Sequence, residues 1–175
     1  MTEQQSTATA TSGKGAVSAL AAVLGKTPSG LFILTANGPD GMATGMLASW
    51  VQQCSFEPPM MTVVVNRKRY LNDWLSEGAI VGLNLLGETQ KSLLGHFGKG
   101  FDPGTPAFEG LRTDQSPQGA TVLVDALGWL EGRVVTSVLT GDHVTYVVEL
   151  VAGKPSTELE TQRPYVHLRK NGLGY

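Results

Sequence analysis

The chain has 175 residues, of which 41% are hydrophobic and 16% are charged, which is typical of one folded domain. Its formal net charge is −2, so it lacks the basic excess expected of a nucleic-acid-binding surface. No run of about 18 apolar residues occurs, so we expect no membrane-spanning helix. The single cysteine, Cys54, cannot form a disulfide within the chain. Together with the lack of an apolar signal core, this predicts a cytoplasmic protein.

The first residues differ in composition from the rest. Residues 1–14 are polar and rich in Ser, Thr and Gln, and we expect a disordered arm there, followed by one domain over residues 15–175. Residues 16–24 carry apolar side chains at helical spacing, which predicts an amphipathic helix that Gly25 ends.

Short apolar runs between turn signals dominate the remainder and predict strands. We expect strands at 31–36, 43–51, 60–66, 79–86, 121–124, 126–139, 143–152 and 165–169, helices at 70–76 and 88–97, and loop at 98–118. Residues 37–41 and 140–142 read as turns. Strands outnumber helices without regular alternation between them. This favours a mainly β fold, a closed antiparallel sheet with a few peripheral helices.

The segment from Gly45 to Ser55 has small and hydroxyl residues where a core strand would carry bulky ones. Ala48 and Ser49 would let a flat ligand approach the backbone, and the hydroxyls of Ser49 and Ser55 add donors. A flavin needs such a slot, with donors for its carbonyls and N5 and with donors and positive charge for its phosphate. An edge strand that ends at the turn Pro58-Pro59 explains the same residues equally well.

Residues 45–59, G-M-L-A-S-W-V-Q-Q-C-S-F-E-P-P, resemble the signature of the flavin reductase family of FMN-binding split barrels. Within that family, the pattern is similar to the flavin reductase-like domain attached to cyanobacterial flavodiiron proteins. The resemblance covers residues 22–175 and implies an antiparallel Greek-key split barrel of six to eight strands that binds FMN, with FAD as the alternative, and forms a homodimer. The flavin-binding residues that it implies in this segment are Met46, Leu47, Ala48, Ser49, Trp50, Gln53, Cys54 and Ser55.

Three further segments carry the resemblance. The family places phosphate contacts at the turn after the strand 60–66, which makes Asn66, Arg67 and Arg69 cofactor-binding candidates and implies that Arg67 or Arg69 contacts the phosphate. A cation beside backbone N–H groups at a strand end suits an anion. The alternative is a solvated basic turn.

The second segment is Gly95-His96-Phe97, where the family has a phenylalanine near the flavin. His96 and Phe97 are therefore flavin-binding candidates, although a core phenylalanine and a surface or capping histidine are the ordinary alternatives.

The third segment, Gly141-Asp142-His143, implies that His143 lies near the flavin and the incoming nicotinamide, which makes it the candidate catalytic residue. The alternative is a hairpin turn whose histidine faces solvent.

The resemblance implies an NAD(P)H-dependent flavin oxidoreductase that passes a hydride to flavin N5. Two other functions remain open: a flavin-binding electron carrier without its own NAD(P)H site, serving a redox partner protein, and a barrel that binds a ligand other than flavin. The scattered histidines and cysteine predict no metal site.

Trp50 and Cys54 depart from the family pattern. Trp50 replaces a small polar residue and could wall the flavin or narrow the substrate pocket. Cys54 stands where Ala or Ser is common, and a free cysteine is ordinarily a small buried apolar residue.

Overall fold

The computed structural model describes residues 18–174, so the expected arm over residues 1–14 lies outside the described residues. Residues 28–167 form the larger of two compact units, and the described parts of Met1–Thr27 and Leu168–Tyr175 form the smaller one. Among residues 18–174, no helix combines the length and apolar character needed to cross a membrane.

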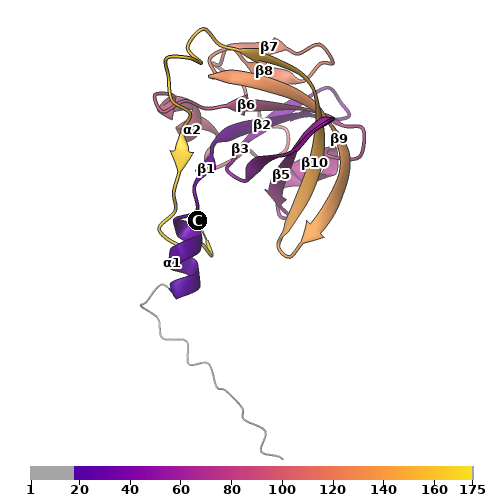
Figure 1. Cartoon of the computed structure of the whole chain (residues 1–175). Coiled ribbons are helices and arrows are strands. Elements are labelled where there is room, and N and C mark those ends of the chain that lie inside the picture. The colour runs from indigo at the N-terminus through magenta and orange to yellow at the C-terminus, as the bar shows by residue number, and fades with distance from the viewer. Residues whose placement is uncertain (1–17, 175) are drawn as a thin grey trace, which may run out of the picture. The chain divides into compact units, whose positions relative to one another are not determined.

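The larger unit is built on a seven-stranded antiparallel sheet with the order β3-β2-β6-β9-β10-β5-β4 (Figure 1). The expected mainly β antiparallel barrel with few helices is therefore confirmed. The strands of this sheet are β2 (Phe32–Asn37), β3 (Ala43–Ala48), β4 (Val51–Phe56), β5 (Pro59–Asn66), β6 (Ile80–Leu85), β9 (Gly128–Thr140) and β10 (His143–Pro155).

Smaller elements complete the unit. Two short antiparallel pairs join β1 (Ser29–Gly30) to β11 (Val166–His167) and β7 (Thr113–Gln115) to β8 (Thr121–Leu123). The helices are the 3-10 helix η1 (Tyr70–Trp74) and the α-helix α2 (Lys91–Phe97). The helix expected at 88–97 therefore begins three residues later than its pattern indicates. The loop expected over 98–118 contains β7, whose residues are all exposed and give no apolar signal.

Strand β2 is buried on both faces, because its successive side chains point to opposite sides of the sheet and a core cluster covers each side. Leu34 and Ala36 join the main core cluster inside the curled sheet. Ile33 joins a second cluster that includes Phe97 of α2. This double burial explains why the residues of β2 are mostly apolar and do not alternate with polar ones.

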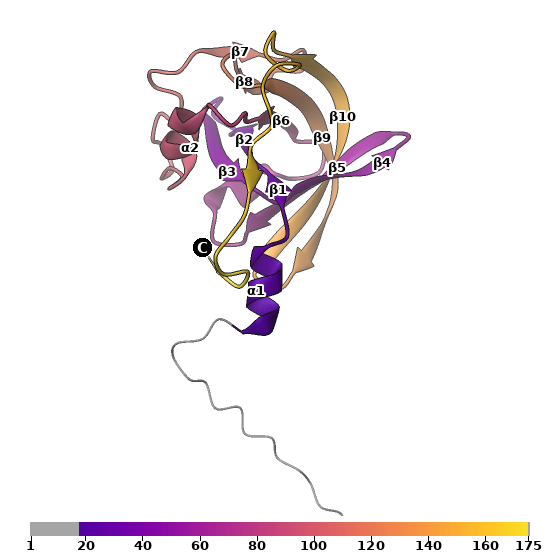
Figure 2. The same ribbon diagram turned by 60° about the vertical axis from the view of Figure 1, so that its left-hand side comes forward.

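The prediction of a single strand over residues 43–51 is wrong in one respect, because this segment belongs to two strands. β3 pairs with β2 and β4 pairs with β5, so the chain turns from one edge of the curled sheet to the other at Ser49 and Trp50 (Figure 2). The Trp50 carbonyl accepts a hydrogen bond from the Val64 N–H at 3.0 Å, which ties this corner to β5.

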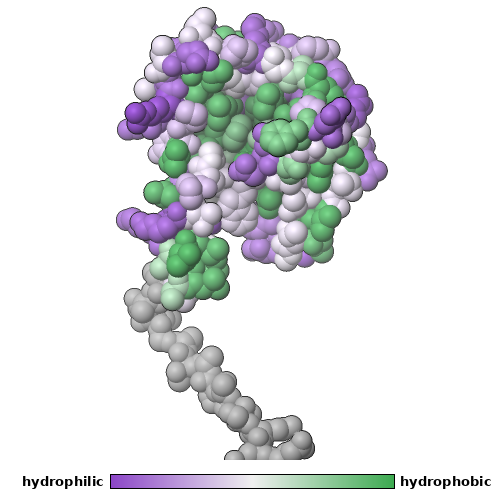
Figure 3. Space-filling model, viewed as in Figure 1, coloured by the Kyte–Doolittle hydropathy of each residue, from purple (hydrophilic) through white to green (hydrophobic). Residues whose placement is uncertain are grey.

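The described part of the smaller unit comprises residues 18–27, which contain α1 (Ala19–Gly25), and residues 168–174. The Ser18 hydroxyl caps α1 by accepting from the Ala21 N–H. Gly25, expected as the stop, is the last helical residue, and a Cβ there would lie 2.7 Å from the Arg169 carbonyl oxygen. Leu20 and Val23 are 63% and 70% exposed, and Figure 3 shows apolar side chains gathered on this helix.

Candidate functional site

Trp50 and His143 lie against each other at one end of the sheet. Their ring centroids are 4.8 Å apart, with the planes inclined by 48°. His143 is the first residue of β10 and is paired with Asn66, the last residue of β5. The corner between β3 and β4, the end of β5 and the start of β10 therefore meet here, and they bring together three of the predicted site residues.

His143 is held by its neighbour in the hairpin. Its Nδ1 lies 2.7 Å from an Asp142 carboxylate oxygen, and this hydrogen bond lowers the pKa of Asp142 below its ordinary value. The carboxylate therefore accepts from Nδ1–H, which leaves Nε2 of a neutral ring as an acceptor. His143 is only 8% exposed, so the alternative of a solvent-facing histidine is wrong. The predicted hairpin turn is confirmed, with Gly141 at φ +67°.

The basic turn after β5 borders an open hollow of about 420 Å³ that is lined by Asn66, Arg67, Lys68 and Asp142. The backbone N–H groups of this turn are already engaged. The Arg67 N–H donates to the Asp142 carbonyl at 3.1 Å, and the Lys68 N–H donates to Asn66 Oδ1 at 3.0 Å. An anion in the hollow would therefore be held by the side chains of Arg67 and Lys68 rather than by backbone donors.

Arg69 points to a different place. Its guanidinium donates to the Lys99 carbonyl at 3.1 Å, and a Cβ on Gly100 would lie 2.4 Å from Nη1. Arg69 borders a narrow cleft that Met46 also lines. The structure thus separates Arg69 from the hollow at Arg67, although its remaining guanidinium N–H groups are still available as donors.

The predicted residues of β3 and its end are divided between surface and core. Met46 and Leu47 are half-buried, whereas Ala48 and Ser49 are 2% and 8% exposed. Ala48 belongs to the main core cluster, and Leu47 packs against the second one. Only part of this stretch is therefore open to a ligand.

Gln53, Cys54 and Ser55 lie on the β4–β5 hairpin, which projects from the sheet in Figure 2. A β-bulge falls between Gln53 and Ser55, and the Gln53 side-chain amide donates to the Ser55 carbonyl. Cys54 is exposed, so its interpretation as a buried apolar residue is wrong. The structure does not bring these residues to the Trp50–His143 pair within one chain.

The predicted site residues of helix α2 face the interior of the larger unit and a neighbouring loop. Phe97 is 1% exposed, and a Cβ on Gly45 of β3 would lie 2.8 Å from its ring. Nε2 of His96 is 2.8 Å from the Ala107 carbonyl oxygen. Phe97 is thus a core phenylalanine, the alternative expected for it, whereas His96 is half-buried and contacts the loop that follows α2.

Two polar residues at this end of the sheet, Asn72 and Tyr146, were missed from the sequence. Asn72 donates to the Asn66 and Arg69 carbonyls and accepts from the Tyr146 hydroxyl. The only sequence signal for Asn72 is a polar amide on an otherwise amphipathic short helix, three residues after the basic turn.

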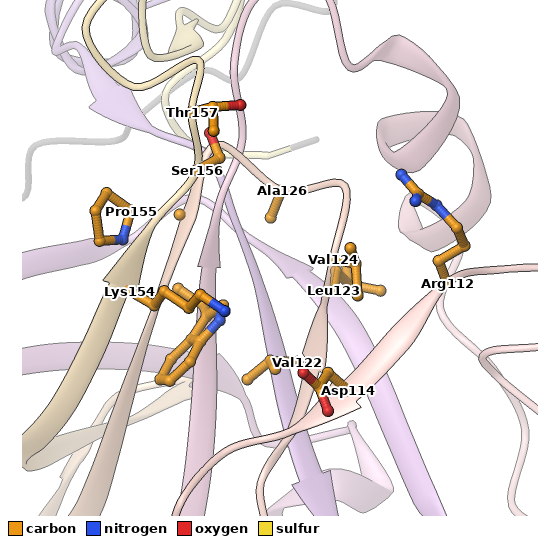
Figure 4. A pocket seen from close by; sticks show the side chains of 12 residues that line it. Arg112, Asp114, Val122, Leu123, Val124, Ala126, Lys154, Pro155, Ser156 and Thr157 are labelled. Atoms are coloured by element: carbon orange, nitrogen blue, oxygen red, sulfur yellow. The ribbon is translucent and has the colours of Figure 1, made fainter.

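A second hollow, of about 350 Å³, lies where β8, the start of β9 and the end of β10 come together (Figure 4). Its floor includes the buried side chains of Val122 and Leu123. Lys154 and Asp114 line it with opposite charges, and Arg112 is paired with Asp125. None of the predicted site residues lines this hollow. Its balanced charge is poorly suited to a phosphate.

The family model described as "Flavin reductase like domain" matches residues 24–172. Diflavin flavoprotein A 1 of Synechocystis sp. is 36% identical over 132 residues, which cover 75% of this chain and 23% of that protein. The chain spans about a quarter of the length of the curated relatives that it matches.

Solved structures share the fold. The NADH:FAD oxidoreductase SgcE6 of Streptomyces globisporus C-1027 aligns with a TM-score of 0.76 at 20% identity, covering 85% of this chain and 87% of that one. It was also solved in complex with NAD and FAD fragments. The styrene monooxygenase flavin reductase of Pseudomonas putida S12 aligns with a TM-score of 0.71 at 25% identity, covering 85% of this chain and 92% of that one.

Proposed function

Because this chain belongs to the family of the flavin reductase-like domain, we propose that it is an oxidoreductase that transfers a hydride from NAD(P)H to a bound flavin. FMN is the proposed cofactor, with FAD as the alternative. The observation that carries the proposal is the meeting of Trp50, His143 and the basic turn at one end of β5 and β10. An aromatic ring, an oriented imidazole and two cations beside a hollow are the groups that a flavin phosphate and a nicotinamide require.

The residues present fit such a cofactor. Arg67 and Lys68 line a hollow with room for a phosphate, and both side chains can form charge-assisted hydrogen bonds with it. The indole of Trp50 offers an aromatic face next to the β3–β4 corner. A bound flavin supplies the hydride acceptor.

His143 acts in this proposal by binding and orientation. Asp142 fixes the ring through Nδ1, which leaves Nε2 able to accept a hydrogen bond from the carboxamide of a nicotinamide. Hydride transfer needs no general acid from the protein, so holding two rings in register is the main contribution of the chain.

We also propose that the chain forms a homodimer. Val138 and Leu139 of β9 are 58% and 61% exposed, and Phe56 at the tip of the β4–β5 hairpin is 89% exposed. These apolar side chains lie on two hairpins, β9–β10 and β4–β5, and a second copy of the chain would cover part of this apolar surface. The exposed thiol of Cys54 is compatible with a reducing, cytoplasmic location.

One observation favours a second candidate, a flavin-binding electron carrier that serves a redox partner protein. Trp50 rests on His143, and His143 is only 8% exposed. The indole therefore occupies space beside the histidine that a nicotinamide would need, so a carrier reduced by another protein is the alternative to direct NAD(P)H oxidation.

Anaerobic mixing of the FMN-loaded protein with NADH or NADPH separates these functions. Loss of the visible flavin absorption is expected for the reductase, and His143→Gln should slow this loss without changing flavin affinity. His96→Gln, which alters a histidine bound to a loop, is the matched control. Absorption that persists with both nucleotides but disappears with dithionite would establish the carrier. A protein that binds no flavin would remove both functions.

A further inference from the structure

The side chain of Asn72 joins three segments of the larger unit. Asn72 lies in η1, and its Nδ2 donates to the Asn66 carbonyl at 2.9 Å and to the Arg69 carbonyl at 2.6 Å. Its Oδ1 accepts from the Tyr146 hydroxyl at 2.9 Å. Both N–H donors of this amide and one of the two lone pairs on its oxygen are therefore engaged.

These bonds close the basic turn at both ends. The Asn66 carbonyl also accepts from the Arg69 N–H at 3.0 Å, and the Arg69 carbonyl accepts from the Asn72 N–H at 3.1 Å. The two carbonyls are thereby held toward the amide, while Arg67 and Lys68 between them line the hollow. Without the amide, each carbonyl would lose one partner, and the turn would be free to change shape.

Tyr146 determines which way the amide points. The ring is 5% exposed on β10, and its hydroxyl donates to Oδ1, so the NH2 group must face the two carbonyls. Burial, followed by the negative charge of Asp73, raises the pKa of Tyr146, so the hydroxyl keeps its proton and remains a donor.

The same strand carries the histidine of the candidate site. Tyr146 is three residues after His143 on β10. The chain of bonds from Tyr146 through Asn72 to the turn therefore fixes the backbone of the basic turn relative to the strand that presents the imidazole.

We propose that Asn72, oriented by Tyr146, is a positioning residue that shapes the turn Asn66–Arg69 for a flavin phosphate and thereby makes the chain prefer FMN to riboflavin. This inference rests on the proposed flavin-binding function. Asn72 does not line the hollow. It acts by holding the backbone of the turn that carries Arg67 and Lys68.

The test compares the affinities for FMN and riboflavin, which differ only in the phosphate, by flavin fluorescence titration of the full chain. Asn72→Ala should lower the ratio of FMN affinity to riboflavin affinity about tenfold, because charge-assisted contacts depend on geometry. Tyr146→Phe should lower it in the same direction by about threefold, the effect of one lost neutral hydrogen bond. Riboflavin affinity itself should change less than about twofold.

Asn37→Ala is the matched control. The Asn37 amide also donates to a backbone carbonyl, that of Gly119, and accepts from a hydroxyl, that of Thr121, but it does not contact the turn. This variant should keep the wild-type ratio. A loss of phosphate preference in Asn37→Ala equal to that in Asn72→Ala would show a general structural effect and overturn the proposal.

The outcomes separate this inference from the function on which it rests. A wild-type protein that binds no flavin refutes the proposed function. A wild-type protein that prefers FMN, with Asn72→Ala and Tyr146→Phe keeping that preference, refutes only the role of Asn72. If thermal unfolding shows that Asn72→Ala does not fold, Tyr146→Phe decides the question, because it removes one oxygen and keeps the buried ring.

Discussion

The carboxylate of Asp142 holds His143 through a hydrogen bond of 2.7 Å between Oδ1 and Nδ1. The two residues are adjacent in sequence, yet they lie in different environments. The Asp142 side chain is 85% exposed, whereas the His143 side chain is 10% exposed. The exposed carboxylate thus fixes a buried ring at the point where β10 begins.

This pair predicts a pH-dependent contribution to stability. The hydrogen bond to His143 lowers the pKa of Asp142 below 3.8. A group with a lowered folded-state pKa stabilises the fold above its ordinary pKa and loses that contribution as the pH falls through the folded-state pKa. We therefore expect the difference in unfolding free energy between wild type and Asp142→Asn to be smaller at about pH 3 than at about pH 5. Urea unfolding at both pH values measures it, and an equal difference at both would contradict the assignment.

The contact between Trp50 and His143 predicts how accessible the imidazole is. Removing the indole in Trp50→Ala should expose the ring and increase the rate at which diethyl pyrocarbonate modifies His143. Trp50→Phe should give an intermediate rate because a smaller ring remains over the histidine. Peptide mapping distinguishes His143 from His96, whose rate serves as the internal reference because it contacts the Ala107 carbonyl instead. Equal rates at His143 in all three proteins would show that Trp50 does not shield it.

The basic turn predicts different roles for its two arginines. Arg67 lines the hollow, so Arg67→Ala should weaken FMN binding by about 1–3 kcal/mol and leave riboflavin binding unchanged. Arg69 is bound to the Lys99 carbonyl, so Arg69→Ala should mainly loosen the loop after α2, which limited proteolysis followed by mass spectrometry would detect. An equal loss of FMN affinity in the two variants would show that Arg69 also reaches the phosphate.

The sequence was sufficient for the architecture because strand periodicity and turn residues are local signals. The run 60–66 and the turn at Gly141 depend on neighbouring residues only, and both were predicted. The break at Ser49 and Trp50 could not be read in the same way. It depends on which strands pair with β3 and β4, and this pairing is set by the closure of the whole sheet.

The candidate site was predicted less completely, for a similar reason. The resemblance placed His143 and Arg67 in the site, and the structure brings their segments together at paired ends of β10 and β5. It could not separate Arg69 from Arg67, because the direction of the Arg69 side chain is set by its bond to the carbonyl of Lys99, 30 residues away. Nor could it find Asn72, whose partner Tyr146 is 74 residues away.

The close approach of Gly45 to Phe97 predicts a cost for any side chain at that position. A Cβ on Gly45 would lie 2.8 Å from the Phe97 ring, and the ring is 1% exposed in the second core cluster. Gly45→Ala should therefore lower the unfolding free energy by about 1–3 kcal/mol, the usual effect of overpacking. Gly95→Ala is the matched control, since a Cβ there meets nothing within 4 Å and alanine favours the helix. Combining Gly45→Ala with Phe97→Leu should cost less than the sum of the two single changes, because the smaller side chain makes room for the added methyl group. Chemical denaturation of the four variants measures this coupling, and strict additivity would show that the two residues do not touch.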